Sequence, residues 1–353
     1  MTARGLARRA GVAALAAATP IALAWRFAHV YRARAGFPRP HPPTITPGDL
    51  GLPFETLEVT TPDGLDLPAW WIPARGGERG PAVVLVHGWE SARHRTLPIA
   101  QFLHAAGFHV LTLDVRGHGA NPAEELPVSA GEFGSDALAG IEIALLKTEV
   151  TAVAVLGHSM GAIGAILAAA AEPRVAAVVL TSTPADPYRL TRQTFRLAHL
   201  PIPDPIAYPL AWLTTRVYLE PRRHPVDAIS ATSAIRRYAG PILAIHGTED
   251  RVVPVSHLGR LVAAAEAARA SHAGAAPIQR LTIDGGQHSW LYEFPEYRAT
   301  VARFLTQALG GPLDPDDAAR AAVGVDARRL PDVERRFDAI EALATATAGR
   351  ANG

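Results

Sequence analysis

Short apolar runs recur along the chain between residues 54 and 283, and longer segments with a helical spacing of apolar positions separate most of them. This pattern predicts strands at residues 54–60, 65–72, 83–86, 110–113, 153–156, 175–180, 242–245 and 278–283. The longer segments predict helices at about residues 96–106, 135–147, 160–171, 255–269 and 295–308. Pro62-Asp63-Gly64 predicts a turn between the first two strands.

The alternation of strands and helices also predicts how the sheet is built. Strands that alternate with helices form parallel βαβ units, so we expect an α/β fold in which a mostly parallel sheet carries helices on both faces. In such a sheet, ligands bind beyond the carboxyl ends of the strands. Residues that directly follow a predicted strand are therefore the first candidates for chemistry.

Two segments interrupt this alternation. Residues 184–240 contain many prolines and no clean strand pattern, although they lie between two predicted strands, and we expect a small helical lid there. Residues 311–353 are rich in alanine and arginine and predict a helical tail. Four apolar residues of the tail share one helix face, which we expect to dock on the body of the protein: Val333, Phe337, Ile340 and Ala344.

The first 34 residues differ in kind from the rest of the chain. Three arginines precede an uncharged stretch, residues 10–25, which is shorter than the roughly 20 residues that cross a bilayer as a helix. Arg26 follows, and its long side chain could reach the membrane interface, a boundary that Trp25 and Tyr31 also suit. We expect an uncleaved membrane anchor. The alternatives are a signal peptide cleaved after Ala22-Leu23-Ala24, which would make the protein secreted, and an amphipathic helix.

Composition shifts divide the chain into four parts. The N-terminal segment, residues 1–34, is followed by a proline-rich linker, residues 35–54, whose proline density favours an extended spacer. The main domain is expected at residues 55–310, with the lid inside it, and the tail at residues 311–353.

Bulk composition excludes several classes of function. A hydrophobic content of 48% with 19% charged residues is typical of a globular protein. The 34 basic and 33 acidic residues leave a net charge of +1, so no basic surplus indicates a nucleic-acid partner. The chain has no cysteine, which excludes disulfides, thiolate metal sites and a cysteine nucleophile. It also lacks a His-Glu-x-x-His metal motif and a nucleotide-binding glycine motif, so we expect no metal and no cofactor.

The sequence Gly157-His158-Ser159-Met160-Gly161 directly follows a predicted strand and precedes a predicted helix. This is the context of the G-x-S-x-G nucleophile elbow, in which a tight turn lifts the serine hydroxyl clear of the sheet. We expect Ser159 to be a nucleophile. His158 occupies the variable position of the motif, and we expect its side chain to point away from the reacting centre.

A serine hydroxyl is a poor nucleophile at neutral pH and needs a base, which in turn needs an orienting carboxylate. Asp250 and His288 each follow a predicted strand, which gives the chain order Ser, Asp, His that accompanies a nucleophile elbow. Glu249 and Asp284 are rival acids close by, and His257 and His272 are rival bases.

Together these motifs resemble the α/β-hydrolase superfamily over residues 55–310. The resemblance also rests on His87-Gly88-Trp89, on Asp114-Val115-Arg116-Gly117-His118-Gly119 and on Gly286-Gln287-His288. It is nearest to a subgroup with monoacylglycerol lipase-like, lysophospholipase-like and serine-aminopeptidase-like members. The resemblance implies that Ser159 is the nucleophile, His288 the general base and acid, and Asp250 the orienting acid. It further implies an oxyanion hole built from the backbone N–H groups of Trp89 and Met160.

The function that these features favour is hydrolysis of a carboxylic ester, including lipid or acylglycerol esters, through an acyl-enzyme. Peptide or amide hydrolysis and acyl transfer would use the same residues and remain alternatives, as does a catalytically inactive fold that serves as a binding module. The expected partners are a small-molecule or lipid ester and, through the N-terminal helix, a membrane. The sequence leaves the substrate and the oligomeric state open.

Overall fold

A single eight-stranded sheet forms the centre of the computed structural model, which describes residues 3–77, 79–270 and 275–330, with the backbone alone for residues 3–17. The strand order is β1-β2-β4-β3-β5-β6-β7-β8. β1 and β2 pair antiparallel to their neighbours, and the other strands run parallel, which confirms the predicted α/β fold. The strands are β1 Glu55–Thr60, β2 Asp66–Ile72, β3 Gly80–Val86, β4 His109–Leu113, β5 Val150–His158, β6 Val175–Thr181, β7 Ile242–Gly247 and β8 Ile278–Ile283.

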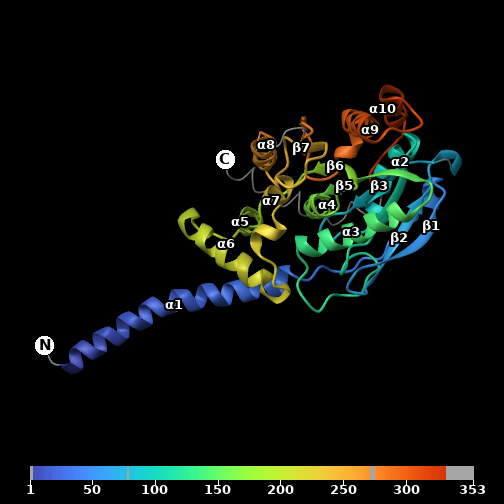
Figure 1. Ribbon diagram of the computed structural model, residues 1–353. Helices are drawn as coiled ribbons and strands as arrows, with labels where there is room; N and C mark the ends of the chain where they lie inside the picture. Colours follow the sequence, from blue (N-terminus) through green and yellow to red (C-terminus); the bar gives the residue numbers. More distant parts are fainter. Residues whose placement is uncertain (1–2, 78, 271–274, 331–353) are drawn as a thin grey trace.

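Helices cover both faces of this sheet (Figure 1). Alternate residues of a strand point to opposite faces, so Val84 and Val86 of β3 join one apolar cluster and Val83 and Leu85 join the other. The first cluster includes residues of α3, α4 and α8, and the second includes residues of α2, α9 and α10. These helices are α2 Leu97–Ala105, α3 Ala130–Leu146, α4 Met160–Ala171, α8 Ser256–Arg269, α9 Pro295–Leu309 and α10 Pro315–Val323.

The segment between β6 and β7 is helical. It contains α5 Pro187–Leu197, α6 Asp204–Leu219 and α7 Ala231–Ile235. Asp186 begins α5 by accepting a hydrogen bond from the backbone N–H of Arg189, and Pro187 occupies a first-turn position, where its missing N–H costs nothing. We call α5 and α6 the lid helices. They contact each other and lie beside α1, Ala3–Ala35 (Figure 1).

The N-terminal helix α1 extends from the body at its start and packs along α6 at its end (Figure 1). Within the part of the chain that the structure describes, no helix is both long enough and apolar enough to cross a membrane. The predicted anchor falls partly on residues 3–17, whose side chains lie outside the described residues. After α1, Gly36 accepts a backbone hydrogen bond from Val128 at 2.8 Å, and Pro38 is buried, so the start of the proline-rich segment lies against the body.

The tail begins with α10, whose buried alanines pack in the cluster shared with α2 and α9. The tail face predicted from Val333, Phe337, Ile340 and Ala344 lies outside the described residues.

Candidate active site

Ser159 lies at the sharp turn between β5 and α4, with φ 54° and ψ −117°, a backbone conformation that L-residues rarely adopt. Glycines flank it because a Cβ at either position would collide with backbone atoms. A Cβ on Gly157 would collide with the carbonyl group of Gly161, and a Cβ on Gly161 would collide with the carbonyl oxygens of Val86 and His87. The local sequence therefore permits a turn that larger residues would prevent. The turn places Ser159 at the carboxyl end of β5, as the elbow motif predicts.

The structure brings Ser159, His288 and Asp250 together from three separate loops. His288 Nδ1 lies 2.8 Å from Asp250 Oδ2, and His288 Nε2 lies 3.1 Å from Ser159 Oγ. Because the carboxylate can only accept, Nδ1 carries the proton and Nε2 is free to accept from the serine hydroxyl. All three side chains are buried or nearly so. This is the geometry of a nucleophile, a base and an orienting acid.

Asp250 is fixed from several sides. Its Oδ1 accepts the backbone N–H groups of Val252 at 3.0 Å and Val253 at 2.7 Å. Its Oδ2 also lies 3.2 Å from Nε2 of His246, a neighbour that the sequence analysis did not single out. Burial raises the pKa of Asp250, but attraction to His288 and hydrogen bonds from the two histidines outweigh it and hold the pKa well below its usual value. The group is therefore a carboxylate at any working pH.

The rival groups lie elsewhere. Asp284 is exposed and accepts a hydrogen bond from Thr248 at 3.3 Å, and Glu249 is exposed as well. Nδ1 of His257 accepts the backbone N–H of Ala185 at 2.9 Å, and burial lowers the pKa of His257 to about 4. None of these three groups is hydrogen-bonded to Ser159 or His288 within the described part of the chain. The other rival base, His272, lies outside the described residues.

The two predicted oxyanion-hole residues, Trp89 and Met160, both line the space beside Ser159. Met160 is the first residue of α4, where a backbone N–H has no acceptor within its own helix. The orientation of the Trp89 N–H depends on His87. Nδ1 of His87 donates to the Gly88 carbonyl at 2.7 Å, and its Nε2 accepts the Val115 N–H at 3.0 Å. The Gly88 carbonyl and the Trp89 N–H belong to one planar peptide, so the imidazole sets the direction of both.

The expectation that His158 points away from the reacting centre is wrong. Its Nε2 donates to the backbone carbonyl of His288 at 2.9 Å, and the two imidazole centroids lie 5.0 Å apart. Ser182 Oγ donates to the same carbonyl at 2.9 Å. The variable position of the elbow thus helps to hold the loop that carries His288. Burial, followed by repulsion from His288, lowers the pKa of His158 to about 4, so the ring is neutral.

The motif at residues 114–119 has a structural role. Arg116 pairs with Asp136 at 2.6 Å and with Asp63 at 2.7 Å, and Arg93 pairs with the fully buried Asp114. These ion pairs fix the loop after β4, whose His118 stacks edge to face against Trp89 at 5.2 Å.

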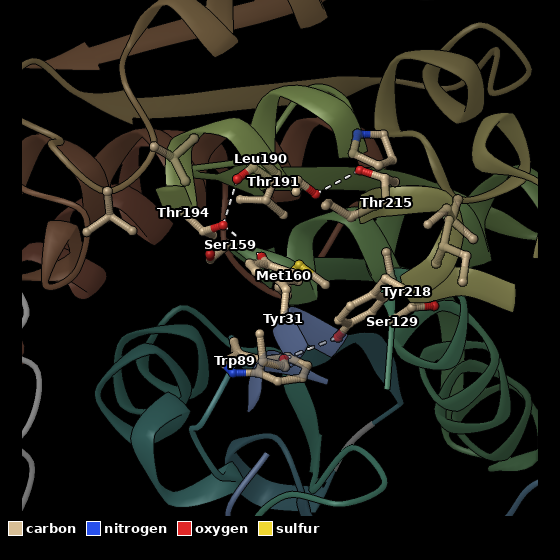
Figure 2. Close-up of a pocket in the computed structure, with 18 of the residues that line it drawn as sticks. Tyr31, Trp89, Ser129, Ser159, Met160, Leu190, Thr191, Thr194, Thr215 and Tyr218 are labelled. Carbon is tan, nitrogen blue, oxygen red and sulfur yellow. Dashed lines mark hydrogen bonds between the residues drawn. The ribbon is translucent and has the colours of Figure 1, made fainter. Parts of the chain in front are cut away.

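Two cavities meet at Ser159. The first, which we call the apolar cavity, has a volume of about 280 Å³ and extends under the lid helices (Figure 2). Most of its lining is apolar, and it includes Met160, Ile163, Pro187, Leu190, Leu197, Leu219, Ile229 and Val253. The second, which we call the mixed cavity, has a volume of about 380 Å³ and contains charged and polar groups: Glu90, Ser91, Arg95, His158, His288 and Ser289.

No cluster of three or more histidines and carboxylates suited to a metal ion is present within residues 3–77, 79–270 and 275–330. The polar groups around Ser159 instead pair with one another, as described above.

Comparison with known proteins gives one family match, two relatives and one similar solved structure. Residues 77–239 match a family model described as "Serine aminopeptidase, S33". An uncharacterized Mycobacterium tuberculosis protein, Rv2307c, is 31% identical over 253 residues, which cover 70% of this chain and 78% of the relative. The human protein ABHD12B is 26% identical and matches 67% of this chain and 64% of its own length. The fold is similar to that of the Pyrococcus furiosus esterase Pf2001, with a TM-score of 0.60, 23% identity and coverage of 78% of this chain and 97% of that one.

Proposed function

Because the chain belongs to the serine hydrolases of the α/β-hydrolase superfamily, we propose that it hydrolyses carboxylic esters with an apolar acyl group, through an acyl-enzyme on Ser159. The observation that carries this proposal is the hydrogen-bonded series of Ser159, His288 and Asp250, whose serine lines the apolar cavity. A buried apolar cavity beside a nucleophile favours an alkyl chain over a charged peptide.

The chemistry follows from the geometry. Ser159 Oγ attacks the ester carbonyl carbon while His288 Nε2 takes the hydroxyl proton, and Asp250 stabilises the imidazolium that forms. The negative charge on the former carbonyl oxygen is held by the Trp89 and Met160 N–H groups. The intermediate collapses, His288 gives its proton to the departing alcohol, and an acyl-serine ester remains. Water then loses a proton to His288 and attacks the acyl carbon, and His288 returns that proton to Ser159 Oγ as the carboxylic acid leaves.

We assign the two halves of the ester to the two cavities. The acyl chain fits the apolar cavity, and the alcohol fits the mixed cavity, where it leaves next to His288.

Labelling with a fluorophosphonate tests whether Ser159 is an activated nucleophile, and panels of substrates test whether the enzyme prefers esters or amides. We expect the wild-type protein to be labelled at Ser159 and to hydrolyse p-nitrophenyl esters of increasing acyl length far faster than aminoacyl-nitroanilides. We expect Ser159→Ala to abolish both labelling and turnover in a folded protein. A folded wild-type protein that takes no label would instead indicate a binding module.

Amide or peptide hydrolysis is the second candidate, and Glu90 is the observation that favours it. This acidic residue lines the mixed cavity at a left-handed backbone position, φ 49°, and a carboxylate there could pair with the α-ammonium group of a peptide. In that case Glu90→Gln would lower kcat/KM for aminoacyl-nitroanilides at least tenfold while leaving uncharged esters unaffected.

We also propose that residues 1–34 attach the protein to a membrane. Support comes from the arginines that precede the apolar stretch and from exposed apolar side chains on the free part of α1, including Ile21, Leu23 and Trp25. Fractionation of cells that express the full chain tests this. Recovery in a carbonate-resistant pellet is expected, and recovery in the supernatant with Met1 as N-terminus would contradict it.

A further inference from the structure

The second half of α1 has one covered face. Ala28 is fully buried and Phe27, Tyr31 and Arg32 are partly buried, whereas Val30 is 40% exposed. Residues three and four apart share a helix face, so this pattern is that of a helix lying against a neighbour. The neighbour is α6, which runs beside α1 (Figure 1).

Aromatic contacts join α1 to both lid helices. The rings of Phe27 and Phe195 lie 5.4 Å apart at 81°, and those of Tyr31 and Phe195 lie 5.7 Å apart at 86°. Both are edge-to-face arrangements, which aromatic rings prefer. Tyr31 also lies 6.3 Å from Tyr218 of α6. The Tyr31 ring is therefore held between α5 and α6.

The polar groups of Tyr31 and Arg32, on the same covered face of α1, form hydrogen bonds with the lid helices. The Thr194 hydroxyl donates to the Thr191 carbonyl at 2.7 Å, so the Tyr31 hydroxyl is the donor in its 2.7 Å bond to Thr194 Oγ1. One residue further on, Arg32 donates to the Val217 carbonyl at 2.9 Å, near the C-terminus of α6, where a cation is favoured. Two successive residues of α1 thus hold one lid helix each.

Tyr31 and Ala35 also line the apolar cavity, together with Ser159 and Met160 (Figure 2). The Tyr218 hydroxyl, which bonds to the carbonyl of Val128 at 2.5 Å, lies in the same wall. The cavity that starts at the nucleophile is therefore bounded on one side by the N-terminal helix, a segment far from the catalytic residues in the sequence.

We propose that α1 is a wall of the acyl-binding cavity and that the ring of Tyr31 limits the length of the acyl chain the enzyme accepts. This inference rests on the proposed ester hydrolysis. An acyl chain that fills the cavity meets the Tyr31 ring, and further methylenes have no apolar surface to cover. A smaller side chain opens space for them, and each extra buried methylene then contributes about fourfold in kcat/KM.

The test compares full-length Tyr31→Ala, Tyr31→Trp and Val30→Ala proteins across p-nitrophenyl esters from acetate to myristate. The measured quantity is kcat/KM for each chain length divided by that for acetate. We expect Tyr31→Ala to move the optimum to longer chains, with at least a tenfold gain in the ratio for the longest. Tyr31→Trp should move the optimum to shorter chains. Val30→Ala, on the exposed face of the same helix, should keep the wild-type profile.

Two results would overturn the inference: an unchanged optimum in both Tyr31 variants, or the same shift in Val30→Ala. Fluorophosphonate labelling of Ser159 in each variant shows that the protein is folded and its nucleophile active. If the wild-type protein neither takes the label nor hydrolyses acetate, the proposed function fails; if it does both and the Tyr31 profiles do not move, only the role of α1 fails.

Discussion

His87 shows how a single tautomer can control the site. Its ring donates through Nδ1 and accepts through Nε2, so only the neutral form with the proton on Nδ1 makes both hydrogen bonds. Burial lowers the pKa of His87 to about 4, which keeps that form at neutral pH. The ring therefore acts on the reaction through the Gly88–Trp89 peptide and is a positioning residue.

The first prediction concerns His87→Asn, which keeps a polar side chain but cannot span both partners. We expect kcat for p-nitrophenyl acetate to fall by about 10²-fold, the range for loss of one oxyanion-hole donor, with KM within about threefold. Steady-state kinetics checks this split. A fall in the amount of folded protein with normal kcat per labelled Ser159 would indicate a purely structural role instead.

The second prediction concerns Asp250→Asn. The asparagine side chain has one oxygen and one NH₂ group, and the NH₂ group must face either His288 or the two backbone donors of Val252 and Val253. With the oxygen accepting from the backbone donors, the NH₂ group faces His288 Nδ1 and favours the imidazole tautomer that carries its proton on Nε2. We expect kcat to fall by about 10⁴-fold, as in other triads. Asp284→Asn is the matched control and should keep at least half of the activity. The reverse order of effects would mean that Asp284 is the acid.

At the scale of single residues, the sequence predicts the reacting groups better than the groups that position them. Ser159, Asp250 and His288 could be found because each follows a strand and their order is informative. His246 and His158 could not, because the direction in which a ring points depends on neighbours from distant loops. The sequence indicated only a membrane-interface position for Tyr31, because its partner Thr194 is far away in the chain.

At the scale of elements, the turn between β5 and α4 depends on close backbone packing. The third prediction is that Gly161→Ala destabilises the protein by at least several kcal/mol, because its Cβ would overlap the carbonyl oxygens that end β3. Gly259→Ala is the matched control. Gly259 lies within α8 with open space around its Cα, so alanine there should add about 0.5–1 kcal/mol. Urea unfolding of both variants provides the comparison, and a Gly161→Ala protein as stable as wild type would contradict the argument.

Elements with strong periodicity were predictable, and their partners were not. All eight strands appear near the expected residues. The central strands such as β3 are buried on both faces and leave unbroken apolar runs, whereas the edge strand β1 is mostly exposed and was recognised by its alternation and the turn that follows it. The covered face of α1 carries the same kind of apolar residues that a membrane helix would carry. Only the three-dimensional structure shows that residues 27–35 of this helix face α5 and α6.

At the scale of the whole molecule, several neutral histidines lie deep in the fold. Burial lowers the pKa values of His87 and His158 to about 4 and that of His118 to about 3, from an ordinary value of 6.5. Between these lowered pKa values and pH 6.5, the unfolded chain binds more protons than the native protein. The free energy of unfolding is therefore highest above pH 6.5 and falls as the pH drops toward 4.

The fourth prediction is that the free energy of unfolding at pH 5 is lower than at pH 7.5 by roughly 1–2 kcal/mol for each buried histidine. Urea titrations at the two pH values measure the difference. His118→Gln removes one titrating ring and leaves the others. Its loss of stability between the two pH values should therefore be smaller than that of the wild type by roughly 1–2 kcal/mol, whatever its stability at pH 7.5. His199→Gln, a change at an exposed histidine, should leave the wild-type difference intact. Equal losses in wild type and His118→Gln would show that buried rings do not cause the acid sensitivity.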